Sequence, residues 1–244
     1  FFLELLKRTG LLVSIEYYLS SISPDKRVQG VLIAFLFGSF LEGAAGFGTP
    51  AAIVAPLLVG IGFPALTAVS IALIANSTPV VFGAVGTPIR VGLQGLDIGL
   101  APYYAALINM ALAMLVPVFI ITVLVLSSKP SGKDDSPRKK TSLKNKARAI
   151  VECIPFALWA GLCFGIPYFL SSKIGYEFPS LLGPMAAMLI VGWTTKLGWL
   201  VPKNKFAFKE SGKILKPKFT LIQSISPYLL LSALLLGAKF TLPS

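Results

Sequence analysis

The stretch 41-LEGAAGFGTPAA-52 lies inside a long apolar region and decides how that region folds. It places one carboxyl side chain, three glycines and a Thr-Pro pair where an uninterrupted membrane helix would carry Leu, Ile and Val. Glycine weakens a helix, whereas proline at the first helical position loses nothing, because its missing N–H would be unbonded there anyway. The stretch therefore predicts that one helix ends near Glu42. A new helix begins at Pro50, with Thr49 as its N-cap.

The composition around this stretch is typical of an integral membrane protein. Of the 244 residues, 55% are hydrophobic and only 13% are charged, and the mean hydropathy is +0.79. A soluble domain carries about 25% charged residues. Uncharged runs of roughly the 20 residues that cross a hydrocarbon core recur at 98–128, 153–172, 178–195 and 219–238. Because these runs are continuous rather than alternating, we predict an all-α polytopic membrane protein and not a barrel.

Charge divides the chain into four regions, namely 1–27, 28–128, 129–148 and 149–244. The first is predicted to be an amphipathic interfacial segment whose helix ends before Pro24. The second is a membrane region that holds the interrupted helices. The third is a basic loop, and the fourth contains further transmembrane helices near 150–170, 179–201 and 220–240. The first residues read as the end of a helix already in progress, so we expect an upstream part.

Two basic clusters predict the topology. Eight Lys or Arg lie within 129–148, and seven lysines lie within 196–218. Positive charge beside apolar spans favours the cytoplasmic side, so both loops are expected there. The loops 90–100 and 171–178 then lie outside. The side of residue 27 stays open, because fully crossing broken helices put it outside and a re-entrant hairpin puts it inside.

The same composition excludes several functions. The net charge of +12 is explained by topology, with some attraction to anionic lipid, so we expect no nucleic-acid partner. The chain has no histidine, which excludes a Ser-His-Asp triad, a histidine metal site and a histidine proton relay. Cys153 and Cys163 are expected to be packing residues. We therefore predict no enzyme, no metal and no cofactor.

The region from Val28 to Ile89 carries one charge in 62 residues, on Glu42. Short helices are expected over 50–61 and 65–75, joined by the turn 60-GIGFP-64, before 76-NSTP-79 breaks the chain again. Each short helix spans about 17 Å, or half the hydrocarbon core. Because they are antiparallel, the discontinuities around 42–50 and 76–79 should lie at one depth. Two interrupted segments that meet are typical of a transporter binding site.

Glu42 is the candidate proton-coupling residue, because a carboxyl group inside a membrane span is costly and usually faces a cavity. The alternative is a neutral glutamic acid that hydrogen-bonds the broken backbone. Helix starts offer N–H groups that suit an anion, and neutral side chains suit a carboxylate and a hydroxyl. The candidate substrate-binding residues at the breaks are Gly46, Gly48, Thr49, Asn76, Ser77, Thr78, Gly86, Thr87 and Arg90. The alternatives are helix packing for the glycines and snorkelling to the interface for Arg90. Tyr168 is assigned to an interfacial aromatic belt.

The elements 42-EGAAGFGTP-50 and 76-NSTPVVFGAVGTPI-89 resemble those of the bacterial L-lactate permease family, as do the flanks SISPDKRVQ and 179-PSLLGPMAAML-189. The likeness covers nearly the whole chain. It implies a multi-pass protein of the bacterial plasma (inner) membrane that takes up L-lactate, and often D-lactate or glycolate, by proton symport. Family members are roughly twice this length, so the resemblance also implies a partial-length chain.

Three alternatives accompany this prediction. Sodium could replace the proton, held by unwound carbonyl groups at the breaks. The chain could be a truncated, non-transporting membrane fragment. An intramembrane enzyme would need several acids at one depth. The sequence leaves open the substrate's chirality, the activity of this chain alone and the oligomeric state.

Overall fold

The computed structural model describes residues 8–46, 48–127, 143–208 and 217–220, with positions 223, 224, 226, 230 and 234. Within these residues all regular structure is helical, which confirms the predicted all-α class. The elements are α2 (Leu11–Ser21), α3 (Lys26–Gly30), the π-helix η1 (Val31–Phe37), α4 (Gly38–Ala45), α5 (Thr49–Gly60), α6 (Ala65–Ala75), the 3-10 helix η2 (Pro79–Phe82), α7 (Gly83–Gly92), α8 (Ala101–Ser127), α9 (Leu143–Ser172) and α10 (Pro179–Lys196). The predicted span near 220–240 lies largely outside the described residues.

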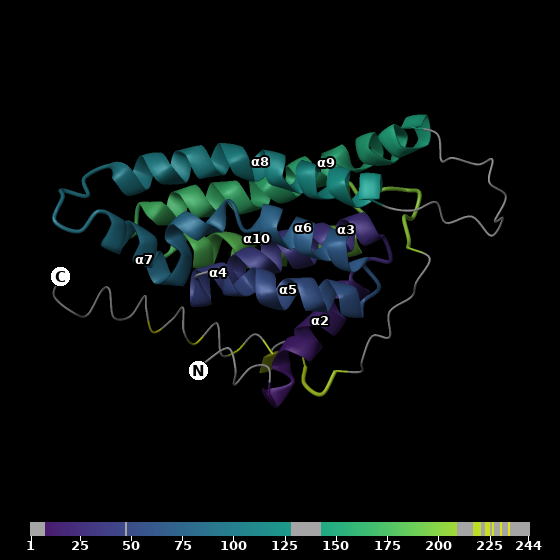
Figure 1. The fold of residues 1–244 in the computed structure, drawn as a ribbon, viewed down its shortest axis with the longest axis horizontal. Coiled ribbons are helices and arrows are strands. Elements are labelled where there is room, and N and C mark those ends of the chain that lie inside the picture. The colour runs from purple at the N-terminus through teal and green to yellow at the C-terminus, as the bar shows by residue number, and fades with distance from the viewer. Residues whose placement is uncertain are drawn as a thin grey trace.

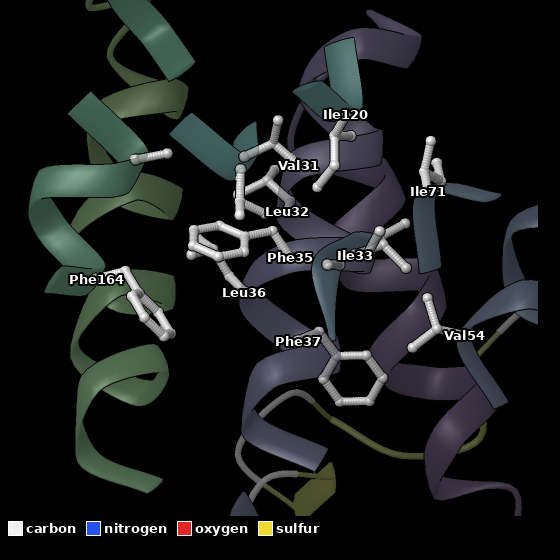
Figure 2. Packing of buried hydrophobic residues seen from close by; sticks show 14 of the residues in the cluster. Val31, Leu32, Ile33, Phe35, Leu36, Phe37, Val54, Ile71, Ile120 and Phe164 are labelled. Carbon is white, nitrogen blue, oxygen red and sulfur yellow. The ribbon is translucent and has the colours of Figure 1, made fainter. Parts of the chain in front are cut away.

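The segments α3, η1 and α4 form one continuous helix at the centre of the fold. It runs from Lys26 to Ala45 and is long and apolar enough to cross a membrane, as are α8 and α9. Every side chain of η1 is buried. Figure 2 shows why: Phe35 faces Phe164 of α9 on one side, while Val54 of α5 and Ile71 of α6 lie on another. A helix surrounded on all sides must be apolar all round, which the sequence of η1 satisfies.

Helices α8 and α9 lie side by side along one face of the molecule (Figure 1). They approach closely at Gly161, where an added Cβ would lie 2.6 Å from the Ala113 carbonyl oxygen. Helix α9 begins at Leu143, so the end of the predicted loop 129–148 is helical. The reason is local, since Leu, Lys, Ala and Arg in this segment all favour a helix. Helix α10 ends at Lys196, before Gly198 turns the chain with a φ of +75°.

The predicted short-helix hairpin is present. Helices α5 and α6 pack against each other and are joined by a turn in which Gly62 has a φ of +95°. Beyond residue 75 the chain bends by 59° before continuing through η2 and α7, so α6 and η2–α7 form either a broken span or a re-entrant loop. Three of the described helices are thus long and apolar enough to cross a membrane, or four if this bent pair counts as one span.

A buried ion pair connects several helices at one end of the bundle. Arg27 and Asp25 are each at most 2% exposed and their side chains lie 2.7 Å apart. The Arg27 guanidinium also donates to the carbonyl groups of Ala149 in α9 and Asn204 beyond α10. Lys26 donates to the carbonyl oxygen of Ile61, in the turn of the α5–α6 hairpin.

These contacts show which segments share one end of the bundle. Ala149 follows the first basic loop and Asn204 lies in the second, so residue 27 is at the same end of the bundle as both. The α5–α6 turn lies at that end as well, because its Ile61 carbonyl is bonded to Lys26. The chain therefore leaves this end of the bundle through α3, η1 and α4 and returns to it through α5, with the first break between α4 and α5.

Replacing Asp25 by alanine is expected to destabilise the folded protein by about 3–5 kcal/mol, because buried Arg27 would keep only the more distant Glu152 carboxylate, 4.0 Å away and partly exposed, as a counter-charge. The measurement is the free energy of unfolding of the full-length protein in detergent. Arg148→Ala is the matched control, since this arginine is exposed one residue before Ala149. Equal stability of the two variants would contradict the assignment of a buried, mutually dependent pair.

Candidate functional site

Glu42 lies in α4, sixteen residues from Lys26 or about 24 Å along the helix. The side chain is fully buried, at 0% exposed. Among the described residues neither carboxyl oxygen has a partner that satisfies hydrogen-bond geometry. The backbone N–H of Gly48 and the amide of Asn76 nevertheless approach the carboxyl closely enough to interact with it. An ionisable group is thus buried with incomplete hydrogen bonding, which is typical of functional sites in membrane proteins.

Three parts of the chain surround this carboxyl group. Gly48 belongs to the first break in the helices, at 42–50, and Asn76 belongs to the second break, at 76–79. Gly83, just beyond η2, supplies the third, because a Cβ at that position would lie 2.5 Å from Oε1 of Glu42. Only glycine leaves room for the carboxyl there. The two breaks therefore meet at Glu42, as their predicted position at one depth requires.

The first break is built by glycines in conformations that other residues avoid. Gly46 has a φ of +67° and a ψ of −167°, a region that only glycine populates freely, and it packs against the backbone of Ala84. Gly48 has a φ of +71° and is the N-cap of α5. Thr49 is instead the first helical residue, so the predicted threonine cap is wrong by one position. A left-handed glycine lets the chain turn sharply enough to start α5 beside Glu42.

The polar side chains of the second break point in different directions. Asn76 is half-buried, and its side-chain oxygen has no hydrogen-bond partner among the described residues. Thr78 is fully buried, and its hydroxyl is likewise unpartnered there. Ser77, by contrast, is exposed, and its hydroxyl donates to the Ile74 carbonyl oxygen at 2.7 Å. Asn76 thus reaches the site around Glu42, whereas Ser77 turns away.

The third Thr-Pro pair follows a strained turn. Ala84, Val85 and Gly86 have φ values of 44°, 57° and 75°, a left-handed run that is costly for alanine and valine. Gly86 also packs tightly on the carbonyl oxygen of Tyr176, 2.5 Å from where its Cβ would be. Thr87 donates its hydroxyl to the Ala84 carbonyl, so it stabilises this turn. Strain of this kind is often found at functional sites.

Arg90 does not join the buried group. It lies exposed in the last turn of α7, seven residues beyond Gly83. The hydroxyl groups of Thr87 and Ser77 also do not reach the carboxyl, because each donates to a backbone carbonyl of its own segment. The described contacts at Glu42 therefore involve Gly48, Asn76 and Gly83.

Sequence reasoning did not identify four residues near this site. Ser39 lies one turn before Glu42 on the same helix face, is fully buried, and has no partner for its hydroxyl among the described residues. Gly83 was visible only as part of the family-like element. Ser180 has no signal of its own in the sequence beyond the family-like flank 179-PSLLGPMAAML-189. The assignment of Tyr168 to an interfacial belt is wrong, because its side chain is 0% exposed and lies in the core.

Interrupted helices that meet at a buried carboxyl group, inside a bundle with membrane-length helices, are typical of membrane transport proteins. The profile of the L-lactate permease family matches residues 1–243, and the chain belongs to that family.

Several curated proteins are similar to the chain. It is 34% identical to L-lactate permease of Bacillus subtilis over 96% of the chain and 41% of that protein. It is 34% identical to L-lactate permease of Escherichia coli K12, over 84% of the chain and 34% of that protein. It is 35% identical to the glycolate permease of the same organism, over 75% of the chain and 30% of that protein. The chain thus spans about two fifths or less of these relatives' length. No solved structure matches it.

Proposed function

We propose that this chain forms the substrate-binding part of a secondary transporter that takes up L-lactate, and related monocarboxylates such as D-lactate or glycolate, by proton symport. Family membership and the names of the relatives support the substrate class. The protein would lie in the bacterial plasma (inner) membrane. The end that holds Arg27 and the start of α9 would be cytoplasmic, because both basic loops adjoin it.

The observation that best supports this proposal is that Glu42 is buried while neither of its carboxyl oxygens has a hydrogen-bond partner of good geometry among the described residues. A lone carboxylate in an apolar interior is costly, so the neutral, protonated form is favoured. A lactate anion bound beside it strengthens that preference, since two negative charges repel each other. Proton and anion then bind together, and the pair carries no net charge across the membrane.

The anion would be held by the start of α5. This helix has twelve residues, and its first N–H groups have no partner within the helix. They carry the partial positive charge of a helix N-terminus and point toward the break, where the Gly48 N–H already approaches Glu42. Asn76 and Thr78 would contact the substrate hydroxyl, because their side-chain oxygens are unpartnered among the described residues.

A second candidate is sodium coupling. The side-chain oxygens of Ser39, Asn76 and Thr78, like the carboxyl oxygens of Glu42, have no hydrogen-bond partner among the described residues, and hard cations prefer oxygen ligands. Sodium would then take the place of the proton at the same carboxyl group.

The test is lactate uptake by the full-length parent protein in liposomes. With an inward proton gradient and choline as the only external cation, lactate is expected to accumulate above its external concentration. Dissipating the proton gradient with an ionophore should reduce uptake to equilibration. Accumulation that requires sodium and ignores the ionophore would reject proton coupling in favour of the second candidate. Absence of any lactate uptake would reject the proposed function itself.

A further inference from the structure

Two consecutive carbonyl groups of the second break are held by two other helices. The Thr78 carbonyl accepts a hydrogen bond from the Tyr168 hydroxyl of α9 at 3.1 Å. The Pro79 carbonyl accepts one from the Ser180 hydroxyl of α10 at 2.6 Å. Both carbonyls lie at the start of the short 3-10 helix η2, whose N-cap is Thr78, so the two hydroxyl bonds connect this end of the break directly to α9 and α10.

Both donors are themselves fixed. Tyr168 and Ser180 are 0% exposed. The Tyr168 ring stacks on Phe164 at 5.1 Å between centroids and meets Phe82 of η2 edge-on at 5.5 Å. The Tyr168 backbone packs against Gly183, and a Cβ added at position 183 would lie 3.0 Å from the Cα of Tyr168. A hydroxyl enclosed in this way has little freedom to follow a shifting acceptor.

Helix α10 also touches the helix that carries Glu42. The backbone carbonyl of Ser180 lies so close to Gly43 that any Cβ at position 43 would overlap it. Ser180 therefore contacts the residue beside Glu42 through its backbone and the second break through its hydroxyl. Ser180 therefore lies between α4, which carries Glu42, and the break that contains Asn76.

We propose that Tyr168 and Ser180 are positioning residues, which hold the second break so that Asn76 stays beside Glu42. The inference rests on the proposed function for its transport readout. A role limited to satisfying the backbone would change stability and protein yield alone. A positioning role also changes how substrate and proton bind, because the group that approaches the carboxyl moves with the break.

The experiment compares Tyr168→Phe and Ser180→Ala in the full-length protein, each losing one hydroxyl. Lactate KM is expected to rise about 3- to 10-fold, the effect of one lost hydrogen bond, with uptake rates normalised to the amount of inserted protein. The midpoint of the uptake–pH profile should move by about half a unit or more. Amide hydrogen exchange in a peptide covering 76–86 should quicken in both variants, whether or not transport is measured.

The matched controls are Ser172→Ala and Tyr103→Phe. Ser172 is buried in α9, but its hydroxyl donates to the Phe169 carbonyl of the same helix. Tyr103 is 37% exposed. Variants that match these controls in KM, pH profile and hydrogen exchange would overturn the proposal, as would variants that lose only yield. If the unmodified parent fails to take up lactate, the proposed function fails, and hydrogen exchange alone decides whether the two hydroxyls position the break.

Discussion

Replacing Glu42 by glutamine is expected to abolish proton-driven accumulation of lactate by the full-length permease. Glutamine has nearly the same shape and keeps a hydrogen-bonding side chain, so the packing against Gly83 is retained. It cannot bind and release a proton, however, so no proton is transported together with the lactate anion. Accumulation driven by a proton gradient should fall at least 100-fold, to the background of protein-free liposomes. Exchange of labelled for unlabelled lactate, which needs no net proton movement, should persist in part.

The control for this substitution is Asp97→Asn. Asp97 is an exposed carboxylate in the loop between α7 and α8, and its oxygen accepts from the Gly99 N–H, a bond that asparagine can also make. Its neutralisation removes one negative charge without touching the breaks. Proton-driven accumulation that survives in Glu42→Gln at the level of Asp97→Asn would contradict the assignment of Glu42 as the proton-binding residue.

The breaks and the hairpin could be predicted because their causes are local. Glycine and proline act within one or two residues of their position, so 42-EGAAGFGTP-50 and 76-NSTP-79 interrupt helices wherever the rest of the chain lies. The hairpin follows from the turn between α5 and α6 and from two apolar segments of similar length. Their meeting at Glu42 then follows from geometry, because antiparallel helices of equal length bring their far ends together.

The side-chain directions at the breaks could not be predicted in the same way. Ser77 and Thr87 have the chemistry of substrate ligands, yet each hydroxyl donates to a carbonyl three residues earlier. Such local hydrogen bonds compete with binding of a substrate by the same hydroxyl, and which of the two prevails depends on the conformation of the backbone turn. Tyr168 and Ser180 lie about 90 and 101 residues from the carbonyls they hold. Only the packing of α9 and α10 against the break brings them there.

Replacing Gly46 by alanine is expected to destabilise the protein by about 2–6 kcal/mol and to prevent transport. Two independent costs add at this position. Its φ of +67° and ψ of −167° lie in a region essentially restricted to glycine, which costs about 1–3 kcal/mol for other residues. An added Cβ would also overlap Ala84, whose backbone N lies 2.7 Å from the Cβ position. Overpacking of a tight interior costs about 1–3 kcal/mol more.

Gly48→Ala separates the two costs. Gly48 also has a left-handed φ, of +71°, but nothing lies within 4 Å of the position that a Cβ would occupy. Alanine there should cost about 1–2 kcal/mol, the penalty for a left-handed conformation alone. The free energy of unfolding in detergent and lactate uptake per inserted protein measure both variants. Because Ala84 is next to Gly83, which packs on Glu42, Gly46→Ala should damage uptake far more than Gly48→Ala. Equal losses in the two variants would show that close contact between the first break and Ala84 does not shape the site.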